Sequence, residues 1–361
     1  MGFGAWDLGF LAAFAAGLRR VTSIVHTLNG TTRWFSYAYD SVGNRKWTTR
    51  EGNVGDVFSY DLAHQVSGVQ LNVANPSGVQ SIPRSIIYDA NGNRGSFTPY
   101  GSNDLYVTND LNQYTQRNRT NAGYDYNGNL TAGLDQPTQS SYTYDAQNRL
   151  TSAHKGGTTE TFTYDGLNRQ VSRTVGGVTT YSAWDGWNLM QEYRNGNITA
   201  TYVHEAGGLV KEMLTNNYYY QDGSGSTSHL ANSGGALLEW YRYDLHGTPI
   251  VYNSGDYQIS GSGFDLHLFT GQQWYSEVGL YDLRNRFYSP DIGRFLQPDP
   301  IGFKGDATNL YRYCGNNPVT LADPSGLEAP WPGWPGAYDG GPMFRACCPN
   351  RFFAKENSTQ V

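Results

Sequence analysis

Two Asp-Pro pairs make residues 279–327 the stretch of the sequence where acid–base chemistry is most readily built. The pairs are Asp299-Pro300 and Asp323-Pro324, and the second opens an Asp-Pro-Ser-Gly turn. Asn316-Asn317-Pro318 adds a turn signal between them. If such turns held the two carboxylates within a few ångströms, one would keep its proton, and the pair could act as acid and base. Asp-Pro also begins ordinary surface turns, so the residues alone leave both interpretations open.

The elements that must position these residues repeat a Tyr-Asp unit. Between residues 124 and 204 the repeat has a constant period of 20, and each aromatic or His residue of the series is followed by Asp or Glu. Self-similarity at a fixed period is typical of stacked supersecondary units. The series consists of Tyr124, Tyr144, Tyr164, Trp184 and His204, with earlier copies at Tyr39 and Tyr88 and looser ones at Tyr60, Tyr243 and Tyr281.

Each unit has the pattern of a β-hairpin. Aromatic residues alternate ahead of the Asp, as in Tyr142/Tyr144 and Phe162/Tyr164, so one face of a strand is aromatic. The Asp then begins a turn in which its carboxylate accepts a backbone N–H two residues on, and a following Gly or Asn supplies positive φ. Stacked hairpins predict an all-β protein with a curling antiparallel sheet, a partial β-shell. The aromatic face either packs a core or forms a platform for sugar rings.

Composition supports this fold class and narrows the function. The 361 residues include 28 Tyr, 44 Gly and 9 Trp but only 16% charged residues, which favours strands and tight turns over helices. A net charge of -6 gives no electrostatic footprint for nucleic acid or an anionic membrane. The apolar run at residues 8–18 is too short to span a bilayer, and its basic residues follow it, unlike those of a signal peptide. The sequence leaves two alternatives for this apolar run, a helical plug and a strand.

Metal and cofactor chemistry lack their usual motifs. The seven His and three Cys have no metal-ligand spacing, and no phosphate loop or nucleophile elbow occurs in a suitable setting. We therefore expect no metal site and no cofactor.

The Tyr-Asp unit resembles the YD repeat of the Rhs and teneurin families, and residues 279–327 resemble the Rhs core domain. The resemblance covers roughly residues 30–327. It implies that the chain cuts itself after the motif Asp-Pro-Ser-Gly-Leu, between Leu327 and Glu328, by an aspartyl-protease-like mechanism. It implies two catalytic carboxylates, Asp299 and Asp323, and a required arginine, Arg286. Arg286 would orient the ionised carboxylate through a bidentate contact.

The resemblance also predicts a division of the chain into an N-terminal segment of unassigned type (1–29), YD repeats (30–217), an Rhs repeat-associated core domain (218–327) and a variable C-terminal tail (328–361). In Rhs proteins the last part is a toxin or effector kept inside the shell. Here this last part is shorter than the roughly 40 residues below which a domain usually needs disulfides, a metal or oligomerisation to fold. We expect a tail or a truncated effector, and the abrupt start at Met1 suggests a fragment or a degenerate gene.

The leading functional interpretation is the scaffold, or encapsulating end, of a polymorphic toxin that is secreted or displayed at the cell surface. At most it would be an intramolecular aspartyl-type autoprotease. Expected partners are a C-terminal effector, an immunity protein or a cell-surface glycan, with neither nucleic acid nor a membrane span. Two alternatives stay open: a non-catalytic cell-surface or carbohydrate-binding YD-repeat protein, and an inert truncated remnant.

Overall fold

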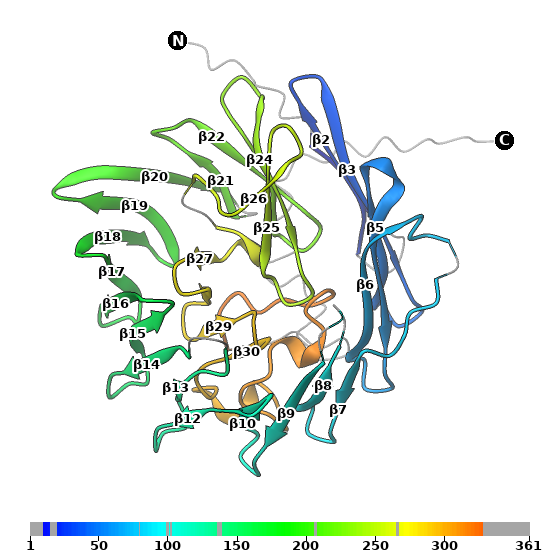
Figure 1. Cartoon of the computed structure of the whole chain (residues 1–361). Helices are drawn as coiled ribbons and strands as arrows, with labels where there is room; N and C mark the ends of the chain where they lie inside the picture. Colours follow the sequence, from blue (N-terminus) through cyan, green and yellow to red (C-terminus); the bar gives the residue numbers. More distant parts are fainter. Residues whose placement is uncertain are drawn as a thin grey trace.

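The predicted all-β architecture is confirmed. The computed structural model of the chain describes residues 10–14, 20–78, 80–98, 101, 103–135, 139–205, 208–264 and 267–327. Within these ranges the secondary structure consists of β-strands and four short 3-10 turns. The strands form antiparallel sheets that curl around the segment after residue 267 without closing into a barrel (Figure 1).

Strand order follows chain order in every sheet, because each strand pairs with its sequence neighbour. The six-stranded sheet contains β1 (Phe10–Phe14), β2 (Val21–Leu28), β3 (Thr31–Tyr39), β4 (Arg45–Arg50), β5 (Val54–Tyr60) and β6 (Val66–Ala74). The five-stranded sheet contains β7 (Ile86–Tyr88), β8 (Arg94–Phe97), β9 (Asp104–Thr108), β10 (Tyr114–Arg117) and β11 (Thr120–Asn121).

The fifteen-stranded sheet completes the curl. It contains β12 (Gly123–Tyr124), β13 (Leu130–Ala132), β14 (Ser141–Tyr144), β15 (Leu150–Lys155), β16 (Thr158–Tyr164), β17 (Gln170–Val175), β18 (Val178–Asp185), β19 (Asn188–Arg194), β20 (Asn197–Glu205), β21 (Gly208–Glu212), β22 (Asn217–Gln221), β23 (Thr227–Ala231), β24 (Leu237–Tyr243), β25 (Pro249–Asn253) and β26 (Gln258–Ile259).

A small sheet and three of the four 3-10 turns lie inside this curl. The sheet contains β27 (Gln273–Tyr275), β28 (Leu280–Asp282), β29 (Phe287–Ser289) and β30 (Arg294–Phe295). The 3-10 turns are η1 (Glu51–Asn53), which connects β4 to β5, and η2 (Phe269–Gly271), η3 (Gly302–Lys304) and η4 (Cys314–Asn316). We call residues 267–327 the inner segment.

The Tyr-Asp turns have the predicted hydrogen bonds. Asp165 accepts the backbone N–H of Leu167 and that of Arg169 through Oδ1, both at 2.9 Å. Asn168 supplies the positive φ at 69°. The same pattern from Asp to residues two and four positions on recurs at Asp40, Asp61, Asp89, Asp125 and Asp145.

The aromatic face packs a core and is not an exposed platform. Tyr142 and Phe162 are buried in one apolar cluster. Tyr144 and Tyr164 pack against that cluster, and their hydroxyls donate to the carbonyls of Leu130 and Leu150. Burying each such ring stabilises the fold by about 1.5–3 kcal/mol. These repeated rings therefore hold adjacent strands together.

The turns also bind the inner segment through a row of side-chain amides. Turns from Asn44 to Asn168 are bonded by the inner segment from Asn317 back to Asn285, mainly through side-chain amides and once through the Tyr311 hydroxyl. The bonds join Asn317 to Asn44, Asn316 to Gln65, Asn309 to Asn93, Tyr311 to Gly128 and Asn285 to Asn168, at 2.7–3.1 Å. The turn side of the shell thus fixes the part of the chain that carries the predicted site.

One region left open by the sequence is assigned by the structure. Residues 10–14 form a strand, which removes the helical-plug alternative for those residues. Before the inner segment, β25 and β26 form a short hairpin, and η2 follows it. Over the ranges that the structure describes, no helix has the length and apolar character needed to cross a membrane.

Candidate active site

Arg286 is the centre of the candidate site. It immediately precedes β29, and its side chain is 3% exposed. Its guanidinium lies 3.6 Å from the centroid of the Phe295 ring, a cation–π geometry. Nη1 donates to the backbone carbonyl of Leu310 at 3.0 Å, and Nε donates to that of Gly326. The inner segment therefore fixes the guanidinium from several sides.

The two predicted carboxylates converge on this guanidinium. Arg286 Nη2 lies 2.8 Å from Asp299 Oδ2 and 3.6 Å from Asp323 Oδ2. Both aspartate side chains are almost completely buried, at 3% and 2% exposure. Asp299 Oδ1 also accepts the backbone N–H of Ile301 at 3.0 Å. One nitrogen atom of Arg286 therefore faces an oxygen of each carboxylate.

The Asp-Pro-Ser-Gly-Leu motif folds back onto the same carboxylates. Asp323 Oδ1 accepts the Leu327 N–H at 3.2 Å and the Ser325 hydroxyl at 3.1 Å. Asn285 donates its side-chain amide to the Ser325 carbonyl at 3.0 Å. Gly326 has φ +68°, and a Cβ there would lie 2.6 Å from the Leu283 carbonyl oxygen. A glycine is needed at this position both for the backbone conformation and for the close approach.

The Leu327 carbonyl oxygen lies on the Asp299 side of the site. A Cβ placed on Gly305 would lie 2.3 Å from Asp299 Oδ2 and 2.5 Å from the Leu327 oxygen. Both oxygens therefore face the same side of the Gly305 Cα. Asp323 contacts the Leu327 N–H, whereas Asp299 is beside the Leu327 carbonyl.

Burial shifts the ionisation of this cluster. It raises the pKa of Asp299, against the opposing effect of Arg286, while the neighbouring Asp323 and Asp306 raise it further. Burial lowers the pKa of Arg286 to about 10, and the surrounding carboxylates oppose that shift. Arg286 stays a cation at neutral pH, and Asp299 holds its proton more tightly than an exposed aspartate does.

Four of the five residues named from the sequence therefore lie together: Arg286, Asp299, Asp323 and Leu327. The fifth, Glu328, lies outside the described residues, as does the whole predicted tail 328–361. The expected bidentate contact of Arg286 with one carboxylate is replaced by contacts of Nη2 with both. The catalytic roles remain predictions.

Sequence reasoning missed Phe295 and Gly305. Phe295 stacks on the guanidinium, and its place two residues after Gly293 carries no signal of that contact. Gly305 occupies an ordinary helical conformation, with φ -78° and ψ -49°, so no turn rule identifies it. Both are found only from the tertiary structure.

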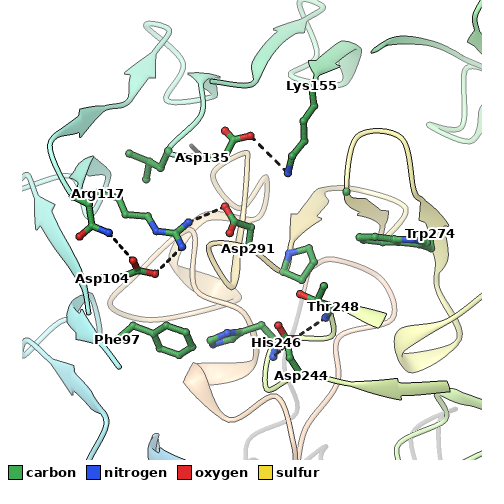
Figure 2. Close-up of a pocket in the computed structure, with 14 residues that line it drawn as sticks. Phe97, Asp104, Arg117, Asp135, Lys155, Asp244, His246, Thr248, Trp274 and Asp291 are labelled. Atoms are coloured by element: carbon green, nitrogen blue, oxygen red, sulfur yellow. Dashed lines mark hydrogen bonds and ion pairs between the residues drawn. The ribbon is translucent and has the colours of Figure 1, made fainter. Parts of the chain in front are cut away.

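A separate cavity of about 490 Å³ lies between the shell and the inner segment (Figure 2). Arg117 bridges Asp104 and Asp291 at 2.7 and 2.8 Å. Lys155 faces Asp135 at 3.6 Å. None of the candidate-site residues lines this cavity, and these lining charges already pair with one another. Across the described part of the chain, no group of three or more His, Cys, Asp or Glu residues is arranged to hold a metal ion.

Comparison with curated proteins gives partial matches. No family model matches the chain. It is 35% identical over 133 residues to salivary gland surface protein 1 of Aedes aegypti, a match covering 36% of this chain and 4% of that protein. It is 35% identical over 112 residues to the tRNA3(Ser)-specific nuclease WapA of Bacillus spizizenii, covering 30% and 5%. It is 34% identical over 111 residues to the double-stranded DNA deaminase toxin A of Burkholderia cenocepacia, covering 30% and 7%.

Solved structures match over nearly the whole chain. A chain of the TcdB2-TccC3-Cdc42 crystal structure superposes with a TM-score of 0.68 and 18% identity, over 93% of this chain and 19% of that one. A chain of the Photorhabdus luminescens Tc holotoxin pore gives a TM-score of 0.65 and 19% identity, over 89% of this chain and 18% of that one. At this identity the match establishes a shared β fold. The chain spans less than a tenth of the curated relatives' length and about a fifth of the structural neighbours'.

Proposed function

We propose that this chain is the scaffold end of an Rhs-type polymorphic toxin and that it cuts its own backbone between Leu327 and Glu328. The observation that carries the cleavage proposal is the convergence of Asp299, Asp323 and Leu327 around Arg286. The toxin assignment draws on the matches to a deaminase toxin, a tRNA nuclease and the fold of a Tc holotoxin component. Secretion or surface display, and release of a C-terminal effector, belong to the same proposal.

In this proposal the two carboxylates have different roles. Asp299 has the raised pKa and lies beside the Leu327 carbonyl oxygen, so it is the proton donor to that oxygen. Asp323 is the base that takes a proton from the attacking water. Arg286 faces Asp323 Oδ2 at 3.6 Å and holds the Gly326 carbonyl, which orients the bond to be cut. The reaction is intramolecular, so the cost of bringing the groups together is met by folding.

The chemical steps balance as peptide hydrolysis. Water adds to the Leu327 carbonyl carbon while its proton passes to Asp323 and the Asp299 proton passes to the carbonyl oxygen. The resulting diol collapses: Asp323 gives its proton to the nitrogen of residue 328 as the C–N bond breaks, and Asp299 regains a proton from a diol hydroxyl. The products are a carboxylic acid at Leu327 and an amine at Glu328, which then ionise in water, and each aspartate is back in its starting state.

Intact-mass measurement of the purified full chain tests this proposal. The wild type is expected to yield fragments 1–327 and 328–361. Asp299→Asn and Asp323→Asn should each leave one intact chain. Asp165→Asn is the matched control, because Asp165 makes the same kind of turn and its carboxylate bonds Leu167 and Arg169 within that turn, and it should cleave like the wild type. A folded wild-type chain that stays intact, or cleavage that persists in both site variants, overturns the proposal.

A further inference from the structure

We infer that Gly305 is a positioning residue of the self-cleavage reaction: its missing side chain leaves the space in which the Asp299 carboxyl meets the Leu327 carbonyl. This inference rests on the proposed function and adds a requirement that neither aspartate supplies. Gly305 directly follows η3 and is half-buried.

The backbone does not explain a glycine at this position. Gly305 has φ -78° and ψ -49°, and its N–H donates to the Gly302 carbonyl at 3.2 Å. Any L-residue adopts this right-handed helical conformation, and alanine loses less chain entropy there than glycine. Gly326, in contrast, needs its positive φ. Whatever requires glycine at 305 must therefore be space.

The space is closed by the two reacting groups themselves. A Cβ on Gly305 would lie 2.3 Å from Asp299 Oδ2, 3.0 Å from Asp299 Cγ and 2.5 Å from the Leu327 carbonyl oxygen. Contacts under 3 Å between a methyl group and oxygen are too close for non-bonded atoms, so one group must move.

Neither oxygen can withdraw without breaking other contacts. Asp299 Oδ2 is held by Arg286 at 2.8 Å, and Asp299 Oδ1 accepts the Ile301 N–H. The Leu327 backbone is held through its N–H by Asp323. A methyl group at 305 would therefore separate the proton donor from the carbonyl while leaving both aspartates present. A misplacement of about 1 Å in such a pair lowers a rate about 100-fold.

The test compares Gly305→Ala with Gly166→Ala in the full chain. Gly166 lies in a Tyr-Asp turn without positive φ, and a Cβ there meets nothing within 4 Å, so it is a matched control. Gly166→Ala should cleave at the wild-type rate, and Gly305→Ala should cleave at least about 100-fold more slowly. Thermal unfolding is compared between Asp323→Asn and Asp323→Asn/Gly305→Ala, so that both chains are intact; each should unfold cooperatively, with a lower midpoint in the double variant because the methyl group displaces a buried contact.

A double variant separates positioning from a general structural effect. If the methyl group acts by displacing Asp299, Gly305→Ala lowers the unfolding midpoint less in an Asp299→Ala background than in an Asp323→Asn background, and both backgrounds are intact chains. Equal midpoint losses in the two backgrounds, or wild-type cleavage by Gly305→Ala, would each overturn the inference and leave the proposed function standing. An intact wild-type chain would instead refute both.

Discussion

Asp165 in the shell and Asp299 in the inner segment use the same local turn but are placed in opposite surroundings. Each accepts the N–H two residues on through Oδ1 and faces an arginine through Oδ2. The Asp165 side chain is 23% exposed, whereas that of Asp299 is 3% exposed. Burial acts to raise the pKa of both; at Asp165 the hydrogen bonds from Arg169 and Leu167 outweigh it and lower that pKa, while at Asp299 burial prevails. Surroundings, not the turn, decide which aspartate can donate a proton.

A third aspartate shows that a raised pKa alone does not mark a catalytic group. Asp244 begins a Tyr-Asp turn, bonds the backbone N–H groups of His246 and Thr248, and is buried. Burial raises its pKa despite those bonds. No peptide carbonyl of a cleavage motif lies beside it. What distinguishes Asp299 is the shared approach of its carboxyl and the Leu327 carbonyl to Gly305.

The largest predicted difference between the two regions comes from removing each arginine. Arg286→Met would leave buried carboxylates without their cation, which costs about 3–5 kcal/mol of unfolding free energy. It should also abolish cleavage, because Arg286 orients both Asp323 and the Gly326 carbonyl. Arg169→Met removes a partly exposed pair and should cost less than about 1 kcal/mol.

Denaturant unfolding of the two variants measures this contrast, with intact mass as the second readout. Arg286→Met should be studied beside Asp323→Asn, so that an uncleaved reference is available. Equal and small losses in both variants would show that burial does not separate the two regions.

The second prediction is opposite pH dependence. In the proposed mechanism cleavage needs Asp299 protonated, and the folded pKa of Asp299 lies above 3.8, so the rate should fall about tenfold per pH unit as pH rises through and beyond that pKa. The proton held by Asp299 likewise contributes stability below 3.8 that is lost as pH rises through the folded pKa. Single-turnover cleavage of chain refolded at a series of pH values measures the profile. A rate that rises with pH throughout would assign the acid role elsewhere.

Local chemistry explains what the sequence made predictable. The Asp turns and the positive φ of Asn168 depend on neighbours within five residues, so they follow from residue type, and the 20-residue period is visible directly in the sequence. The residues of the candidate site were named through the family resemblance, and the structure brings Arg286, Asp299 and Asp323 together. Which aspartate holds the proton did not follow, because burial is set by chain segments far apart.

The sequence also did not predict where the inner segment packs against the turns of the sheets. Its amides bond turns up to 273 residues away, as Asn317 does with Asn44, and asparagine at a turn already has a local explanation. Gly305 gave no signal for a related reason: its backbone is ordinary, and only the approach of Leu327 and Asp299 makes the missing side chain matter.

The smallest effect is predicted for Asp165→Asn, a substitution in a Tyr-Asp turn of the outer sheets. Asparagine keeps an oxygen to accept the Leu167 and Arg169 N–H groups and loses only the charge facing the Arg169 guanidinium. At neutral pH we expect a loss of about 0.5–1 kcal/mol in unfolding free energy and unchanged cleavage.

Because the folded pKa of Asp165 is lowered, the stability that its charge contributes is present above pH 3.8 and is lost as pH falls through the folded pKa. The variant and the wild type should therefore converge in stability at low pH, as measured by denaturant unfolding across that range. A variant that diverged further in acid would mean that the shell carboxylate, like Asp299, is stabilised by its proton and not by its charge.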